Sequence, residues 1–231
     1  MTAPTVVFDL DGTLIDTAPD LIDTLNAVLA REGLPAAAYD SARNLIGGGA
    51  RVMIERGFAA ASRQLPAAQV DRLFRQFIEH YEAHIADRSR PFSGLEAALD
   101  ELAGGGCRLA VCTNKLERLS ALLLEALGLS PRFAAICGAD TFGVQKPDPR
   151  ILVCAIERAG GRLDRAVMVG DSLTDIATAR AAAIPVVAVD FGYSDTPVAK
   201  LNPDRVVSSF ADLPRAVFDL LGAPARANFG E

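Results

Sequence analysis

Short apolar runs alternate with helical patterns along most of the chain. The first run, Thr5–Phe8, is β-branched and aromatic, which is typical of a buried strand. Similar runs predict further strands at 109–112, 134–137, 166–169, 186–189 and 205–207. Helical patterns lie between or after them, at 95–103, 116–127, 149–159, 171–183 and 213–221. This alternation predicts an α/β fold with a doubly wound parallel sheet, a Rossmann-like core.

The segment from Pro19 to Arg90 follows a different pattern, in which no strand is predicted. Apolar residues at helical spacing predict helices at about 19–33, 40–46, 50–61 and 70–85. The run Gly47–Gly49 separates the second of these from the third. The pattern therefore predicts an all-helical insertion of a size to form a small bundle.

The two patterns divide the chain into parts. The α/β core is expected to comprise residues 1–17 and 88–222, and the inserted helical cap residues 18–87. Residues 223–231 carry no pattern and are expected to form a flexible tail.

Acidic and polar residues follow the ends of three predicted strands. Asp9 and Asp11 follow the first strand one residue apart, so strand alternation would bring their carboxylates close together. Thr113 and Asn114 follow the second strand, and Asp171 follows the strand at 166–169. Because the carboxyl ends of parallel strands open on one crevice, we expect these groups to meet there.

Composition narrows the class of protein. The chain has 231 residues and a net charge of −6, which gives no basic surface for nucleic acid and argues against an anionic membrane. No apolar run is long enough to span a membrane, and no leader pattern is found, so a cytoplasmic location is predicted. The four cysteines include no Cys-x-x-Cys pair and are expected to be reduced, mostly buried residues. Only three of the 23 basic residues are lysines, which are Lys115, Lys146 and Lys200.

Four short motifs resemble those of the haloacid dehalogenase-like superfamily of phosphohydrolases. They are, in order, Asp9–Thr13, Thr113–Asn114, Lys146–Pro147 and Gly170–Asp175. The resemblance covers nearly the whole chain, including a helical cap inserted after the first motif. Superfamily members with an Asp-x-Asp first motif are typically phosphatases or phosphomutases, so the resemblance implies a phosphoric monoester hydrolase.

The resemblance also implies roles for individual residues. Asp9 would be the nucleophile that forms an aspartyl-phosphate, and Asp11 would protonate the leaving group and then activate water. Lys146 would be catalytic and bind the phosphoryl group as a compact point charge. Thr113 and Asn114 would bind phosphate oxygens, although a helix cap is an equally natural role for them.

Several carboxylates and a phosphate dianion in one crevice require a cation, and oxygen ligands of this kind suit Mg²⁺. The resemblance assigns the ion to the side chains of Asp9 and Asp171 and to the backbone carbonyl of Asp11. Asp175 would act through water or from behind these ligands. Without the other motifs, Asp171 and Asp175 would be interpreted as a helix cap and an acid in the first helical turn.

The cap is expected to select the leaving group. Gly47, Gly48 and Gly49 could bring backbone amides to a ligand, and Arg51 could pair with a substrate carboxylate or simply lie in solvent. The segments 16–21 and 46–50 look most like those of the bacterial phosphoglycolate phosphatase group, although that group usually has serine in place of Thr17. The predicted substrate is therefore a small phosphorylated metabolite, with 2-phosphoglycolate as the best single choice.

Two alternatives stay open at this stage. A sugar phosphomutase of the same superfamily, similar to β-phosphoglucomutase, has some support from Thr17. A receiver-like binding module controlled by phosphorylation is a poorer match, because such domains are about half this length and lack the insertion. Lys115 is interpreted as a surface residue, and His80 and His84 as edge residues of the helical bundle. The choice between monomer and homodimer is left open.

Overall fold

A computed structural model describes residues 3–39 and 45–222. Its centre is a six-stranded sheet in the order β5-β4-β1-β6-β7-β8, in which every neighbouring pair is parallel. The strands are β1 (Thr5–Phe8), β4 (Arg108–Cys112), β5 (Ala135–Cys137), β6 (Ala166–Gly170), β7 (Val186–Val189) and β8 (Arg205–Val207). The predicted doubly wound α/β fold is thus confirmed.

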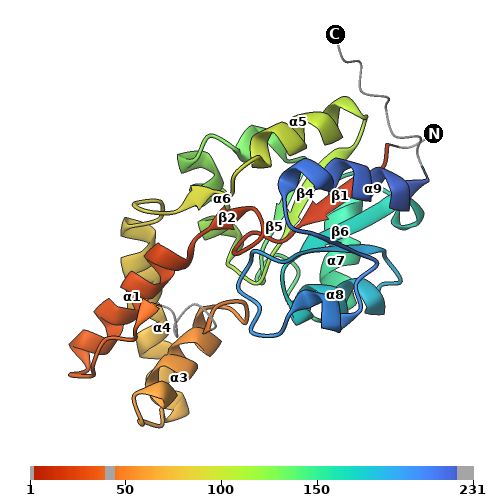
Figure 1. The fold of residues 1–231 in the computed structure, drawn as a ribbon. Helices are drawn as coiled ribbons and strands as arrows, with labels where there is room; N and C mark the ends of the chain where they lie inside the picture. The colour runs from red at the N-terminus through yellow and green to blue at the C-terminus, as the bar shows by residue number, and fades with distance from the viewer. Residues whose placement is uncertain (1–2, 40–44, 223–231) are drawn as a thin grey trace.

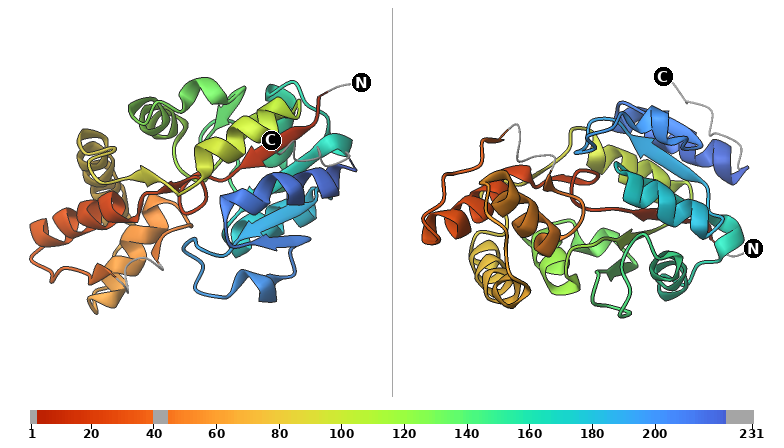
Figure 2. Two further views of the ribbon diagram at one scale, coloured as in Figure 1. Left: turned by 45° about the horizontal axis from the view of Figure 1, so that its top comes forward. Right: turned by 90° about the horizontal axis from the view of Figure 1, so that it is seen from below.

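Helices cover both faces of this sheet, and each face has its own apolar cluster. One cluster joins the sheet to α5 (Leu95–Gly104), α6 (Glu117–Ala126) and α9 (Leu213–Leu221). The other joins it to α7 (Pro149–Arg158) and α8 (Leu173–Ala181). Because side chains alternate along a strand, β1 sends Val6 and Phe8 into the first cluster and Val7 into the second. The layers are visible in Figures 1 and 2.

A third apolar cluster holds together a group of helices at one end of the molecule (Figure 2). These are α1 (Ala18–Arg31), α3 (Ala50–Ala60) and α4 (Ala67–Ala83), which we call the helical unit. The predicted domain boundaries stay a prediction. The helix expected at 40–46, apart from its last two residues, and the tail 223–231 lie outside the described residues.

The chain enters and leaves the helical unit through a two-stranded antiparallel ribbon, β2 (Ile15–Asp16) and β3 (Arg90–Pro91). The sequence did not predict this ribbon, because two residues are too few to produce an alternating pattern. The remaining short elements are 3₁₀ turns at Ser130–Arg132, Leu163–Arg165, Val198–Leu201 and Phe210–Asp212. None of the helices in the described ranges combines the length and apolar character that a membrane span requires.

Strand register places the polar residues of the sequence motifs at one edge of the sheet. Phe8, the last residue of β1, lies opposite Val111 of β4 and Val169 of β6. Asp9 follows Phe8 directly, while Thr113 and Asp171 each lie two residues beyond the partner of Phe8 on their strands. Since β1 lies between β4 and β6, three distant segments reach the same crevice.

Asp20 fastens the helical unit to the segment that returns from it. Its side chain, on α1, is buried and accepts hydrogen bonds from the backbone N–H of Arg88 at 3.0 Å and of Ser89 at 2.7 Å. The Ser89 hydroxyl donates to the same carboxylate at 2.6 Å. One carboxylate therefore satisfies three donors that the return segment would otherwise leave unpaired.

We expect Asp20→Ala to lower the free energy of unfolding by ~2–4 kcal/mol, because buried donors lose their acceptor. Asp23→Ala is the matched control on the same helix, since Asp23 forms an exposed ion pair with Arg88 at 2.8 Å. Its expected cost is below ~1 kcal/mol. Urea unfolding followed by circular dichroism measures both, and equal effects of the two substitutions would contradict the role given to Asp20.

Candidate active site

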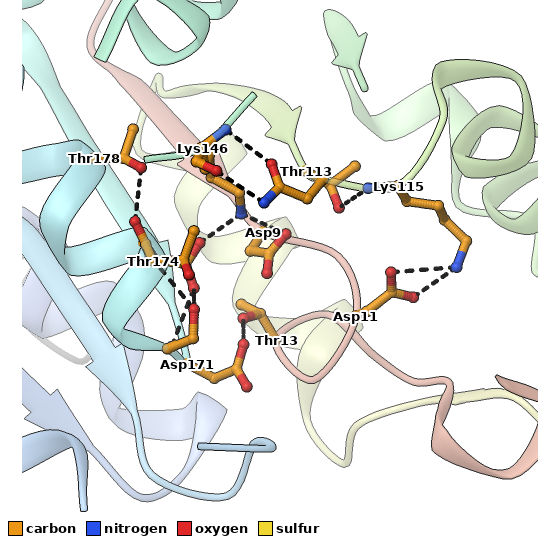
Figure 3. A network of polar contacts seen from close by, with 12 residues as sticks. Asp9, Asp11, Thr13, Thr113, Lys115, Lys146, Asp171, Thr174 and Thr178 are labelled. Atoms are coloured by element: carbon orange, nitrogen blue, oxygen red, sulfur yellow. Dashed lines mark hydrogen bonds and ion pairs between the residues drawn. The ribbon is translucent and has the colours of Figure 1, made fainter. Parts of the chain in front are cut away.

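Three carboxylates meet in the crevice at the end of β1. Asp9, Asp171 and Asp175 are all buried, and each offers an oxygen within 4.8 Å of the others. Asp9 follows β1, Asp171 follows β6, and Asp175 lies in the first turn of α8. Figure 3 shows Asp9 and Asp171 reaching this crevice from separate elements. The motifs at the start and the end of the sequence therefore form one site.

Lys146 is the cation of this cluster (Figure 3). Its Nζ lies 2.8 Å from Oδ1 of Asp9 and 2.5 Å from Oδ1 of Asp175, and its side chain is buried. Burial on its own would lower the pKa of Lys146, but the Asp175 and Asp9 charges outweigh it and raise the pKa. Lys146 is therefore charged at neutral pH and bridges two of the three acids.

Asn114 holds the backbone of Lys146 in place. Its Oδ1 accepts from the Lys146 N–H at 2.8 Å, and its Nδ2 donates to the Lys146 carbonyl at 3.1 Å. Both ends of the amide are thus engaged with the segment that carries the lysine. The neighbouring Thr113 is buried, and its hydroxyl accepts from the Lys115 N–H at 3.2 Å.

Asp175 also closes the start of α8. Its Oδ2 accepts from the Ser172 N–H and hydroxyl, while the Ser172 hydroxyl accepts from the Asp175 N–H, which makes a capping box. Asp175 is the acid in the first helical turn, and it contacts Lys146 at the same time. Asp171 does not cap the helix, because Ser172 occupies that position.

Asp171 is enclosed by glycines and by a tyrosine that follows β7. The Thr13 hydroxyl donates to its Oδ1 at 2.8 Å, and the Tyr193 N–H donates to its Oδ2 at 2.7 Å. A Cβ at Gly192 would come within 2.2 Å of Asp171, and one at Gly12, where φ is +85°, within 2.6 Å. Only glycine permits this enclosure, which fixes the position of the carboxylate.

Burial makes ionisation of these acids costly in the absence of a bound cation. It raises the pKa of Asp9 to about 6, with the Lys146 charge acting against it and Asp175 adding to it. It raises the pKa of Asp171 to about 8, with Asp175 and Asp9 adding to it and the Tyr193 N–H acting against it. Lys146 does not contact Asp171, so the cluster retains uncompensated negative charge. Oxygen donors in this arrangement fit a divalent cation.

Asp11 does not join the cluster, because β1 ends at Phe8 and strand alternation does not extend to position 11. Its carboxylate accepts from Nζ of Lys115 at 2.9 Å and from the Thr17 hydroxyl at 2.8 Å. Figure 3 shows Asp9 and Asp11 directed to different lysines. The interpretation of Lys115 as a surface residue is wrong, since only 8% of it is exposed.

A cavity of about 370 Å³ separates this polar edge of the sheet from the helical unit. Asp9, Asp11 and the segment 113–116 line it on one side, and residues of α1, α3 and α4 line it on the other. Gly47, Gly48, Gly49 and Arg51 border it as well. Arg51 is half exposed, pairs with Asp71 at 2.6 Å and stacks on Phe74, so its guanidinium already has an anionic partner.

Comparison with known proteins agrees with this geometry. The model of the haloacid dehalogenase-like hydrolase family matches residues 6–189. The chain belongs to the haloacid dehalogenase-like hydrolase family. The resemblance drawn from the sequence motifs is therefore confirmed.

Relatives within this family match almost the full length of the chain. Phosphoglycolate phosphatase from Mesorhizobium japonicum is 54% identical over 91% of this chain and 92% of its own length. Phosphoglycolate phosphatase from Agrobacterium fabrum is 50% identical over 95% of this chain and 94% of its own. The crystal structure of a predicted phosphoglycolate phosphatase from Haemophilus somnus has a TM-score of 0.86 at 30% identity, covering 94% and 98% of the two chains.

Two residues of the site escaped the sequence analysis. Lys115 had a usable signal, because it is one of three lysines in the chain and follows Thr113–Asn114 directly. Tyr193 had none beyond its place after a predicted strand. Lys115 and Tyr193 can be recognised as site residues only once the fold places the ends of β4 and β7 beside the first motif.

The cost of ionising Asp171 predicts a pH-dependent stability. The pKa of Asp171 in the folded chain, about 8, lies above its ordinary value of 3.8, so the folded state binds this proton more tightly than the unfolded state. The stability contributed by the protonated form is lost as pH rises toward 8. In EDTA, the free energy of unfolding of wild type relative to Asp171→Asn is therefore expected to fall between pH 5 and pH 8. Urea unfolding at the two pH values tests this, and a constant difference would refute it.

Proposed function

We propose that the protein is a phosphatase that hydrolyses a small phosphomonoester, with 2-phosphoglycolate as its substrate. The observation that carries the proposal is the buried Asp9–Lys146 pair, whose Asp9 lines the cavity. The names of the relatives from Mesorhizobium japonicum and Agrobacterium fabrum support the choice of substrate. Both match the chain over nine-tenths of its length or more.

In the first step, a carboxylate oxygen of Asp9 attacks the phosphorus atom, and the bond from phosphorus to the ester oxygen breaks. The pKa of Asp9, about 6, leaves it ionised at neutral pH, while burial leaves the carboxylate poorly solvated and available for attack. Lys146 neutralises charge beside the transferring group. Asp11 gives its proton to the leaving alkoxide, which departs as the alcohol.

In the second step, Asp11 takes a proton from a water molecule, and the water oxygen attacks the phosphorus of the aspartyl-phosphate. The bond between phosphorus and Asp9 breaks, which releases inorganic phosphate and restores the free carboxylate. Thr17 and Lys115 hold Asp11 in one orientation through both steps. Asn114 contributes by holding the segment of Lys146, and Thr113 lines the cavity beside them.

We propose Mg²⁺ as the cofactor, held by the side chains of Asp9 and Asp171 and by the backbone carbonyl of Asp11. When bound, the ion supplies positive charge to phosphate oxygens and relieves the negative charge of the cluster. Asp175 stands behind these ligands, where Lys146 and Ser172 keep its carboxylate in position.

Residues 18–87 are proposed to act as a cap that shields the reacting groups from bulk water. The cavity lies between the two parts, and its lining on the helical side is largely apolar. Exclusion of water strengthens the charge interactions of Asp9 and Lys146 during transfer. A cap of this kind also places the leaving group, rather than the phosphoryl group, against α1, α3 and α4.

The sugar phosphomutase alternative has no support beyond Thr17, whose hydroxyl donates to Asp11. The two activities differ in their products. A mutase converts hexose phosphates into isomers without net release of phosphate. A phosphate-release assay run beside an isomerisation assay separates them.

We expect Asp9→Asn to fold normally and to lose phosphate release by ~10³-fold or more, because an amide cannot replace the attacking carboxylate. The assay is phosphate release from a panel of small phosphomonoesters that includes 2-phosphoglycolate. Asp219→Asn, on the exposed side of α9, is the matched control and is expected to match wild type. Retention of activity in Asp9→Asn would exclude Asp9 as the nucleophile.

Removal of divalent cations with EDTA is expected to abolish phosphate release, and added Mg²⁺ is expected to restore it. Independently of turnover, Mg²⁺ is expected to raise the melting temperature of wild type at pH 8, because it binds the folded carboxylates. Asp171→Asn is expected to show a much smaller rise. An equal rise in both proteins would place the cation elsewhere.

A further inference from the structure

The cavity has a polar lining on the side of the sheet and a mainly apolar lining on the side of the helical unit, and each is suited to a different part of a ligand. Asp9 and the neighbouring Lys146 are the groups proposed to bind and receive the phosphoryl group. The helical side contributes mainly apolar side chains, which include Leu21, Met53, Phe74 and Phe77. Among the described residues on that side, Tyr81 of α4 is a lining residue whose buried hydroxyl lacks a well-formed hydrogen bond.

Tyr81 is 1% exposed, and among the described residues its hydroxyl interacts with the Lys115 ammonium but forms no hydrogen bond of ordinary geometry. Buried hydroxyls are normally hydrogen-bonded, so a hydroxyl that lacks a well-formed hydrogen bond on a residue lining a cavity indicates a ligand group that completes it. Burial raises the pKa of this hydroxyl to about 12, although the nearby Lys115 charge acts against it. The hydroxyl is therefore a neutral donor throughout the physiological pH range.

Lys115 brings a positive charge to the same place. Its Nζ lies 4.3 Å from the centre of the Tyr81 ring and is almost fully enclosed. An ammonium carries three N–H donors, and the two oxygens of Asp11 accept from at most two of them, at 2.9 and 3.2 Å. The third is available to the Tyr81 hydroxyl or to an anion that enters the cavity.

A donor hydroxyl beside an ammonium is suited to a carboxylate. We propose that Tyr81 and Lys115 bind a carboxylate carried by the alcohol part of the substrate, and so select carboxylated phosphomonoesters. This inference rests on the proposed phosphatase function and assigns the leaving-group end of the same site. Because the Lys115–Asp11 pair borders the same small cavity as Asp9, the carboxylate must be only a few bonds from the phosphate.

Arg51 is the competing candidate for the same carboxylate. Its guanidinium is half exposed and already bonded to Asp71 at 2.6 Å, which makes it a weaker recognition group than an enclosed ammonium. Its position on α3 also borders the cavity, so both candidates can be compared in one assay.

The test compares 2-phosphoglycolate with ethyl phosphate, which has the same number of carbons and lacks the carboxylate. Tyr81→Phe removes only the hydroxyl and is expected to fold like wild type. The ratio of kcat/KM for the two esters is expected to fall by ~10- to 100-fold, mainly through a higher KM for 2-phosphoglycolate. Lys115→Met is expected to lower the same ratio, with an additional loss on both esters because Asp11 loses a partner.

Thr5→Val is the matched control, because Thr5 in β1 carries another buried hydroxyl without a partner and does not border the cavity. It should leave the ratio unchanged. An unchanged ratio in Tyr81→Phe, or a loss shared equally by both esters, would overturn the inference. A fall in the ratio for Arg51→Gln alone would transfer the role to Arg51. Absence of phosphate release from both esters in wild type would instead refute the proposed function.

Discussion

The structure depends most on the buried ammonium of Lys146, which lies between the carboxylates of Asp9 and Asp175. A sheet edge that gathers three acids is unstable without positive charge, because burial disfavours each ionised form. Lys146 offsets two of them, and Asn114 fixes the backbone on which it stands. A second buried ammonium, Lys115, does the same for Asp11 a short distance away. Two acids of the first motif are thereby kept apart and given separate environments.

Much of the core could be predicted from the chain because its signals are local. Each strand of the six-stranded sheet is a largely apolar run, and most of the helices between them have clear apolar stripes, so the parallel sheet and its carboxyl edge follow. The roles of Asp9, Lys146 and Asp171 were assigned through the resemblance of their motifs to the family, and the position of Asp9 and Asp171 after strands agreed with it. The register of β1 with β4 and β6 then brings the residues that follow these strands to the same crevice.

Other features could not be predicted, because they depend on contacts between distant residues. The burial of Lys115 arises only when α4 brings Tyr81 over it, and the enclosure of Asp171 needs the loop after β7. The separation of Asp9 from Asp11 depends on where β1 ends, which an alternating pattern of four residues does not specify. Asn114 was expected to bind phosphate, yet its amide is engaged by the Lys146 backbone, a role that composition cannot reveal.

The ribbon of β2 and β3 restricts how the two parts of the molecule can move. The outgoing and returning crossings are joined by backbone pairing and by the Asp20 carboxylate, so they are held side by side. The Tyr193 hydroxyl donates to Asp16 and accepts from the Ala18 N–H, and the Tyr193 N–H donates to Asp171, which ties the ribbon to the acidic cluster. The connection to the helical unit is thus fastened by the same tyrosine that holds the Asp171 carboxylate in place.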